Sequence, residues 1–489
     1  MPPSPVREDQ SVHLATAVEP QAPTRVAPII AVLALSAFVM ILNETVVGVA
    51  LPNLMQEYSV TATTVQWLTT GFLLTMAVVI PTTGFMLQRF TTRTLFTTAL
   101  LLFIAGTLLA ALAPTFGIIL IARVIQAGGT AIILPLLMTT TLTSVAPAHR
   151  GTVMGLNSVV ISVAPAIGPA LSGVVVSALG WRWIFGLMLP VIAVVFVLGL
   201  VLLRKGGETR KAPLDALSVV LSAMGFGGLV YALASIDAVL DGAWLPVAAL
   251  VLGVLALAAF VRRQLRLQRT SDSALLDLRP FAVHNFRVSV AILMVVFAAM
   301  IGTVTVLPIY LQTGLGASVL TTGLLLLPGG LIQGIVSPII GRLYDAVGPR
   351  PLVIPGALLV AGGQWWLSTL NAETPLPLVG GMYVMFSVGL AMLMTPLMTA
   401  ALSALPRNLY GHGSASLNTL QQLAGAAGTA ILVAALTVGA ATASAGGAAE
   451  GAAQASGAQA AFVVGGVLAL VGVVMSPFVR RVKDNGARG

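Results

Sequence analysis

Apolar runs long enough to cross a lipid bilayer recur from one end of this 489-residue chain to the other. A membrane-spanning helix needs about 20 such residues, and a soluble protein of this length would carry about a quarter charged residues. Here only 8% of the residues are charged and 57% are hydrophobic. The runs do not alternate apolar and polar residues as the strands of a membrane barrel do. The sequence therefore predicts an all-α polytopic membrane protein.

We expect fourteen membrane-spanning helices. They begin near residues 28, 66, 95, 116, 152, 183, 215, 243, 286, 319, 351, 377, 412 and 459. Lys and Arg fall mainly in alternate loops and in the C-terminal tail, whereas the other loops hold Arg182 and acids such as Glu57 and Glu373. Basic loops of membrane proteins lie in the cytoplasm. Both termini are therefore expected there. The Val/Ala/Gly-rich composition suggests a GC-rich bacterium, so we expect the protein in a bacterial cytoplasmic membrane.

Composition also divides the chain. We expect a cytoplasmic disordered tail at 1–27 and a cytoplasmic tail at 480–489. Between them we expect a six-helix bundle at 28–203, a basic loop with an inserted helix pair at 204–270, and a second six-helix bundle at 271–479. Basic loops at 204–213 and 262–287 bracket the inserted pair, and the Ala/Gly-rich stretch 441–460 suggests a mobile loop.

A repeated segment links the two bundles. PTTGFMLQRFTTR (81–93) and PIIGRLYDAVGPR (338–350) share Pro, Gly and Arg at the same offsets. Repeats of this kind are typical of transporters made of two similar halves.

Four motifs carry a resemblance to a known family. The second copy of the repeat contains Gly-x-Leu-x-Asp-x-x-Gly-x-Arg in full, whereas the first has Gln88 in place of the acid. RVIQAGG (123–129) is similar to Arg-x-x-Gln-Gly-x-Gly, and LNETVVGVALP (42–52) to Leu-Asp-x-Thr-Ile-Val-Asn-Val-Ala-Leu-Pro. A fourth pattern of spaced small residues runs through the fifth predicted helix. The matched repeat positions are Gly84, Arg93, Gly341, Asp345, Gly348 and Arg350, and those of the fifth helix include Gly155, Gly168, Pro169 and Gly173.

These motifs resemble the major facilitator superfamily, in its fourteen-helix drug:proton antiporter branch. The resemblance implies two six-helix halves plus two inserted helices, and export of lipophilic drugs driven by the proton gradient without a cofactor. It also implies that the repeated loops gate the cytoplasmic side, that Arg123 takes part in proton coupling, and that the fifth-helix motif marks an antiporter. Small residues at that spacing let helices approach closely. We expect the protein to act as a monomer on small molecules.

Glu44 is the only acid, and Arg123 the only base, well inside a predicted span. An ionisable side chain at this depth is costly and is therefore a functional candidate. Each residue lies about eight positions from the outer end of its helix, roughly 12 Å deep, so the two charges can share one level. We expect them to face each other across water or through Gln126, where a cationic substrate competes with a proton for the carboxylate.

Two other interpretations of this site remain open. Glu44 and Arg123 could form a static ion pair that only holds two helices together. The acid is also one position later than in the family, which turns it about 100° around the helix, so that Asn43 could line the cavity instead. The residues we expect to line the substrate cavity are Asn43, Gln126, Asn418, Gln421 and Gln422.

Several functions are disfavoured by what the chain lacks. It has no cysteine, and its four histidines show no metal-ligand spacing. It has no phosphate-binding Gly-x-x-x-x-Gly-Lys-Ser/Thr loop and no His-Glu-x-x-His motif, so we expect neither an enzyme nor an ATP-driven pump. The scattered basic residues do not predict nucleic-acid binding. An exporter dedicated to one metabolite or antibiotic remains the main alternative, and a proton-coupled uptake symporter is less favoured.

Overall fold

The computed structural model describes residues 26–203, 215–240, 242–270 and 274–481, and most of these residues are helical. Fourteen helices of at least 18 residues occur in this part of the chain. They are α1 (Val26–Tyr58), α3 (Trp67–Arg89), α4 (Thr92–Ala111), α5 (Phe116–Ser144), α6 (Arg150–Leu179), α7 (Arg182–Leu202), α8 (Ala216–Ala234), α10 (Trp244–Thr270), α11 (His284–Ile309), α12 (Val319–Val347), α13 (Arg350–Leu367), α14 (Leu376–Ser403), α15 (Tyr410–Ala445) and α16 (Glu450–Met475).

Thirteen of these helices are long and apolar enough to cross a membrane. The remaining one, α13, has 18 residues and packs against α14 and α16. Large apolar side chains stay exposed on the outside of the bundle, for example Leu101 (50%), Val194 (59%) and Leu358 (55%). Water-exposed apolar surfaces of this extent are rare in soluble proteins, whereas lipid covers them readily. The expected all-α polytopic membrane fold is confirmed.

Thirteen of the predicted helix starts lie within three residues of the observed ones. The exception is α16, which begins at Glu450 and not near 459, because most of the supposed Ala/Gly-rich loop at 441–460 is helical. Alanine is the best helix former, and it dominates this stretch. The prediction of a basic loop from residue 262 was also wrong, since α10 continues to Thr270. Most of the two expected tails and residues 204–214 lie outside the described part of the chain.

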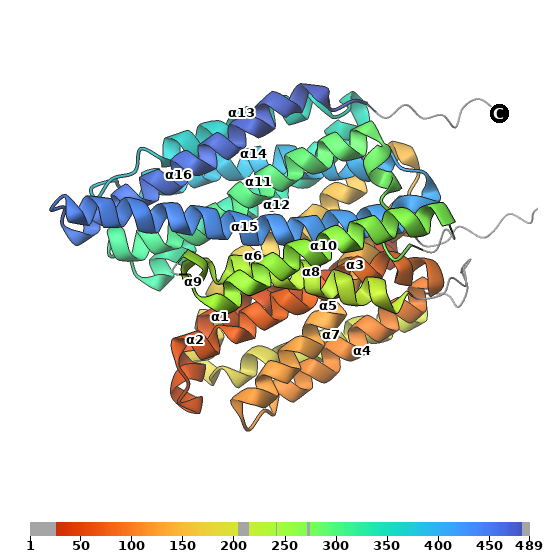
Figure 1. Ribbon diagram of the computed structural model, residues 1–489, viewed down its shortest axis with the longest axis horizontal. Coiled ribbons are helices and arrows are strands. Elements are labelled where there is room, and N and C mark those ends of the chain that lie inside the picture. The colour runs from red at the N-terminus through yellow and green to blue at the C-terminus, as the bar shows by residue number, and fades with distance from the viewer. Residues whose placement is uncertain (1–25, 204–214, 241, 271–273, 482–489) are drawn as a thin grey trace, which may run out of the picture.

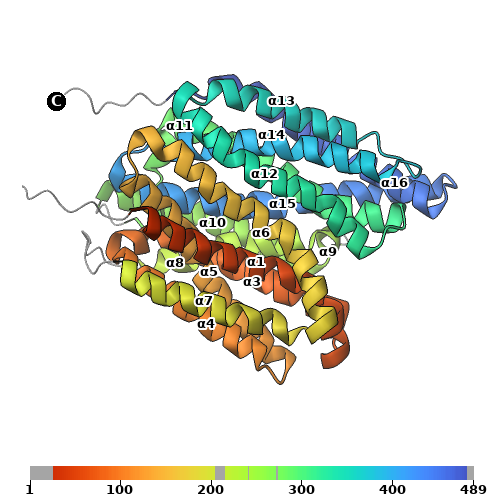
Figure 2. The same cartoon turned by 180° about the vertical axis from the view of Figure 1, so that it is seen from behind.

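Successive long helices run antiparallel and group into two bundles (Figures 1 and 2). One contains α1 and α3–α7, and the other contains α11–α16. We call the end that holds the turns near residues 90, 147 and 406 the basic end, and the opposite end the distal end. The bundles touch through α6 on α12 and through α3 on α15. The residue limits given above for the five segments stay a prediction.

Contact between the bundles is close at the basic end and is lost toward the distal end. On the basic side, a Cβ added at Gly155 would lie 2.5 Å from the Ser337 carbonyl oxygen, so α6 and α12 touch through their backbones. On the distal side, Gly173 of α6 and Gly323 of α12 face open space. Figure 1 shows the ribbons spreading in the same direction.

The two copies of the repeat make equivalent contacts at the basic end. Arg93 Nη1 donates to the carbonyl oxygen of Leu203, just after α7, at 3.1 Å. Arg350 Nε donates to the carbonyl oxygen of Val479, shortly after α16, at 2.8 Å. In each bundle, therefore, the arginine that follows the second long helix is hydrogen-bonded to the chain just after the sixth long helix.

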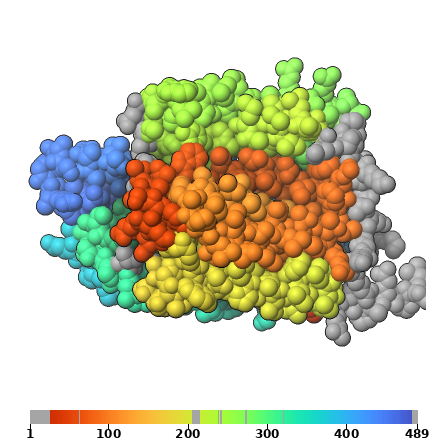
Figure 3. Space-filling model, turned by 90° about the horizontal axis from the view of Figure 1, so that it is seen from below, coloured from red at the N-terminus to blue at the C-terminus, as the bar shows by residue number. Residues whose placement is uncertain are grey.

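The inserted pair, α8 and α10, lies along one edge of the molecule (Figure 3). Gly228 and Gly253 bring the two helices together, because a Cβ at Gly228 would lie 2.8 Å from a backbone oxygen of α10. Phe226 and Phe260 pack edge to face with ring centres 6.1 Å apart. On its other side α8 contacts both α3 and α15, so it spans the line where the two bundles meet.

Asp215, at the start of α8, fastens the pair electrostatically. Its carboxylate accepts bonds from Arg263 Nε (2.7 Å) and Nη2 (2.9 Å) and from the hydroxyl of Ser218. The hydrogen bonds from Arg263 hold the pKa of Asp215 at about 2, below its ordinary 3.8. Because the folded pKa is lowered, this stabilisation is present above pH 3.8 and is lost as the pH falls through about 2.

Replacing Asp215 by asparagine should therefore loosen α8 and α10 at neutral pH. The pKa difference corresponds to about 2 kcal/mol, and partial exposure of Arg263 reduces it to about 1–2 kcal/mol. Amide hydrogen exchange at pH 7 should then be about 5- to 30-fold faster in α8 and α10. Glu373→Gln, which changes an exposed acid elsewhere, should leave this exchange unchanged. Equal effects of both substitutions would contradict the assignment.

Candidate functional site

Arg123 lies fully buried in the middle of the first bundle. Its Nη1 donates to Asn43 Oδ1 at 2.8 Å and to Gln126 Oε1 at 3.1 Å. Its Nε donates to the backbone oxygen of Leu68 at 3.3 Å, and its guanidinium stacks 4.1 Å from the centre of the Phe72 ring. A buried arginine needs such partners, because an uncompensated charge in the protein interior is very costly. The arginine thereby joins α5 to α1 and α3.

The hydrogen-bonded chain continues on both sides of Arg123. Gln126 Nε2 donates to Thr107 Oγ1 of α4 at 2.9 Å, and Asn43 Nδ2 contacts Met188 Sδ of α7 at 3.2 Å. Five helices therefore meet at this cluster. One donor remains free, because Arg123 Nη2 is buried and has no hydrogen-bond partner among the described residues.

Glu44 adjoins the cluster but does not belong to its hydrogen-bond network. Its side chain is only partly buried, whereas Asn43 is fully buried. No hydrogen bond or ion pair to the Glu44 carboxylate occurs within the described part of the chain, although its charge and that of Arg123 interact through space. The static ion pair considered above is therefore not formed in this structure. The acid stands one position later in this sequence than in the family motif. As a result the amide of Asn43 contacts Arg123, and the Glu44 carboxylate makes no hydrogen bond to a described residue.

The small residues of α6 position the segment of α1 that carries Glu44. A Cβ at Gly168 would collide with the side chain of Thr45, and Ser172 Oγ donates to the carbonyl oxygen of Val46 at 2.7 Å. Gly155, nearer the basic end, contacts α12 instead, while Pro169 and Gly173 are exposed. Helix α6 thus supports the acid on one side and touches the other bundle further along.

The polar residues expected on α15 form a separate group. Asn418 Nδ2 donates to the Ser414 carbonyl oxygen at 2.8 Å and contacts Met138 Sδ at 3.7 Å. Met138 follows Arg123 by 15 residues on α5, which is about 22 Å along the helix. The structure therefore does not bring Asn418 to the Arg123 cluster. Gln421 is buried on the same helix, and the buried Nε2 of Gln422 has no partner among the described residues.

At the basic end Asp345 of α12 binds the first turn of α6. Its carboxylate accepts from the backbone N–H groups of Gly151 and Thr152, both at 2.8 Å, and from Thr152 Oγ1 at 2.7 Å. A carboxylate at a helix N-terminus is favoured because the first N–H groups have no partner within the helix. Gly341 allows this approach, since a Cβ there would collide with the backbone at Gly151.

The corresponding contact of the first repeat is weaker. Gln88 Nε2 donates to the carbonyl oxygen of Asn408, just before α15, at 3.3 Å. A Cβ at Gly84 would lie 2.7 Å from His412 Nδ1, so α3 and α15 still pack tightly.

In the second repeat, Gly348 adopts a positive φ of 82°, a conformation that favours glycine. Sequence analysis missed Thr152 and His412 as partners, although Thr152 falls in a helix-opening turn, where carboxylates bind.

Comparison with known proteins extends this description. The chain matches the Major Facilitator Superfamily over residues 33–429. It is 39% identical to the "Lincomycin resistance protein LmrB" of Listeria monocytogenes over 461 residues, covering 93% of this chain and 97% of that protein. It is 30% identical to the "Multidrug resistance protein B homolog" of Mycobacterium tuberculosis, covering 81% and 73%. The crystal structure of the human organic anion transporter MFSD10 has the same fold, with a TM-score of 0.66, 15% identity, and coverage of 92% of this chain and 99% of that chain.

Proposed function

Since the chain belongs to the major facilitator superfamily, we propose that it exports lipophilic, drug-like small molecules in exchange for protons. The chain is a multi-pass membrane transporter of that family. The names of its relatives, which refer to lincomycin resistance and multidrug resistance, support a drug as cargo. The observation that supports the proton coupling is the partly exposed carboxylate of Glu44, which has no hydrogen-bond partner within the described part of the chain and lies near a buried arginine.

The basic end is the cytoplasmic end in this proposal, because it carries most of the Lys and Arg. The termini are then cytoplasmic, and the membrane is the bacterial cytoplasmic membrane. The structure corresponds to a state closed toward the cytoplasm, with Asp345 holding α12 to α6. The distal end faces outward, so a proton from outside reaches Glu44 between the spreading bundles.

Exchange follows from competition at Glu44. A proton and a cationic substrate both neutralise the carboxylate, and a cavity of low polarity disfavours leaving it charged and unoccupied. Binding of a proton from outside therefore releases the substrate outward. After the bundles rock, binding of a substrate from the cytoplasm releases the proton inward. Arg123 and Asn43, which are hydrogen-bonded to each other, stay in place beside Glu44 during this exchange. The protein works as a monomer and needs no cofactor.

Proteoliposomes test this proposal. Acid-inside vesicles should accumulate ethidium, a permanently charged cation, and nigericin should abolish the accumulation by collapsing the pH gradient. One proton for one monovalent cation is electroneutral, so one pH unit should support about tenfold accumulation. A valinomycin-imposed potential should then have no effect on ethidium, but should affect an uncharged substrate.

Other outcomes would point to a different transporter. Accumulation of substrate in alkaline-inside vesicles would indicate symport and would contradict the proposal. A folded protein that moves neither ethidium nor lincomycin under any gradient would indicate an exporter dedicated to another compound. Protein-free vesicles serve as the control for passive entry.

A further inference from the structure

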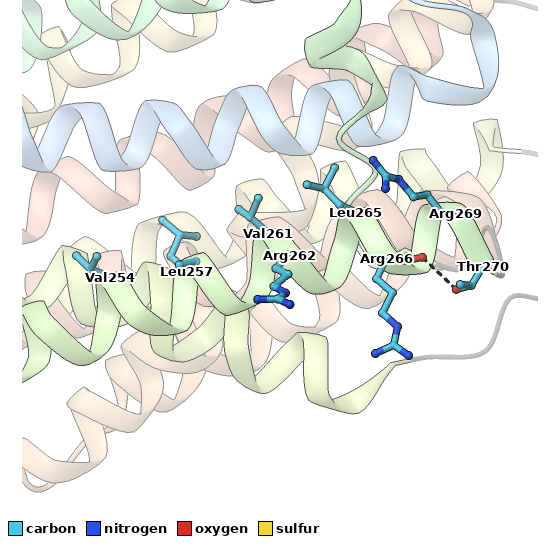
Figure 4. A pocket seen from close by; sticks show the side chains of 9 residues that line it. Val254, Leu257, Val261, Arg262, Leu265, Arg266, Arg269 and Thr270 are labelled. Atoms are coloured by element: carbon cyan, nitrogen blue, oxygen red, sulfur yellow. Dashed lines mark hydrogen bonds between the residues drawn. The ribbon is translucent and has the colours of Figure 1, made fainter.

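One face of α10 carries apolar and basic side chains next to each other. An open pocket of about 810 Å³ lies along this face, and the side chains that line it within the described part of the chain come from this one helix (Figure 4). Its apolar part includes Val254, Val261 and Leu265, and its basic part consists of Arg262, Arg266 and Arg269. The arginines are spaced by four and three residues, which places them on one side of a helix.

This face is turned away from the rest of the protein. The buried residues of α10 recur at helical spacing on the side that packs against α8. Val254, Val261 and Leu265, by contrast, are 51%, 38% and 43% exposed. In a membrane protein this surface meets lipid and not water along the apolar part of the helix.

Among the described residues the three arginines have no partners, unlike their neighbour Arg263. Arg263 forms a two-pronged ion pair with Asp215. Arg262, Arg266 and Arg269 are exposed, and their guanidinium groups have no ion pair or hydrogen bond within the described part of the chain. Three positive charges without a partner in the described part of the chain therefore lie within eight residues, on the side of the helix that faces away from α8.

The order of these groups along α10 matches an amphiphile. The arginines fall within the last nine residues, at the basic end, and the apolar residues extend from Leu265 back to Val254, which is about 12 Å deeper in the helix than Arg262. A phospholipid with its headgroup at the surface would place its phosphate near the arginines and its acyl chains along the apolar residues. Guanidinium groups bind phosphate oxygens through paired hydrogen bonds.

We propose that the α10 pocket is a binding site for one anionic phospholipid, with the phosphate held by Arg262, Arg266 and Arg269. The phosphate of an anionic lipid supplies a net negative charge to balance the three arginines. A zwitterionic lipid has no net charge, because its headgroup also carries a positive group. Basic residues near an anionic membrane surface each strengthen binding about fivefold, so three contribute on the order of a hundredfold. A second copy of this chain is a poorer occupant, because two such faces would repel each other.

Lipid titration of the purified, delipidated protein tests the site. Native mass spectrometry should show phosphatidylglycerol bound at least tenfold more tightly than phosphatidylcholine. The variant Arg262→Gln/Arg266→Gln/Arg269→Gln should lose that preference. The matched control Arg287→Gln/Arg407→Gln/Arg480→Gln removes the same charge from other exposed positions of the basic end and should keep it. Thermal unfolding of both variants verifies that they are folded.

Several results would overturn the proposal. These are equal loss in the control variant, no loss in the α10 variant, equal binding of phosphatidylcholine, or equally tight binding of glycerol 3-phosphate. A dimer that depends on the three arginines would also overturn it, in favour of a second copy. If the α10 variant does not fold, photo-crosslinking of wild-type protein with a diazirine-bearing phosphatidylglycerol tests whether the lipid binds at α10. Adducts should concentrate in residues 254–270, and an even spread over the exposed helices would contradict the site.

Discussion

Glu44→Gln should abolish accumulation of substrate driven by a pH gradient. Glutamine keeps the size of the side chain but cannot exchange a proton, so an imposed pH unit should give no accumulation instead of about tenfold. The purified wild-type protein should also release protons when substrate binds, and the variant should not. Exchange of labelled for unlabelled ethidium without a gradient should also fall, because glutamine, like the protonated acid, offers no negative charge to bind a cation.

The fold should tolerate this substitution. Glu44 makes no hydrogen bond within the described part of the chain, so its replacement leaves no buried partner unsatisfied. Glu373→Gln is the matched control, since it removes a carboxylate from an exposed turn, and it should transport normally. Proton-driven accumulation by the Glu44→Gln protein at the wild-type level would rule out Glu44 as the coupling residue.

Asp345→Ala should open the basic end. It removes three charge-assisted hydrogen bonds, two from backbone N–H groups and one from Thr152, that hold α12 to the first turn of α6. Losing them should shift the equilibrium away from the closed state by about 2–3 kcal/mol, or about 30- to 150-fold. Gln88→Ala, at the equivalent position of the first repeat, removes one neutral bond of 3.3 Å and should have a much smaller effect.

The chain suits a distance measurement of this change, because it contains no cysteine. Spin labels on cysteines introduced at Ala148 and Arg407 would report the separation of the two bundles at the basic end, since both positions are exposed. The Asp345→Ala protein should show a larger population at long distance than the unsubstituted background. Identical distance distributions would show that this contact does not hold the end closed.

Much of the fold could be predicted from the sequence because a membrane constrains helix length and loop charge so strongly. The two wrong predictions concern segments whose composition is typical of loops but whose backbone is helical. The Ala/Gly-rich stretch 441–460 looked like a linker, yet α15 continues to Ala445 and α16 begins at Glu450, so only the four residues between them are not helical. The basic run from 262 looked like a loop, yet arginine is a good helix former, and α10 places Arg262, Arg266 and Arg269 on one face and Arg263 on another.

The candidate site shows a different limit. Counting residues from the helix ends placed Glu44 and Arg123 at one depth, but depth does not fix the direction in which a side chain points. The structure sets Asn43, not Glu44, on the arginine at 2.8 Å. That outcome depends on how α6 packs against Thr45 and Val46, which is long-range information that a local motif does not contain.

Helix α8 covers only one of the two lines along which the bundles meet. It packs on both α3 and α15, whereas no described helix outside the two bundles spans α6 and α12 in the same way. When the bundles tilt apart at the basic end, α8 has to slide on at least one of its two supports. The two lines of contact between the bundles therefore face the lipid differently: α8 and α10 lie over the α3–α15 line, and no described helix outside the two bundles lies over the α6–α12 line.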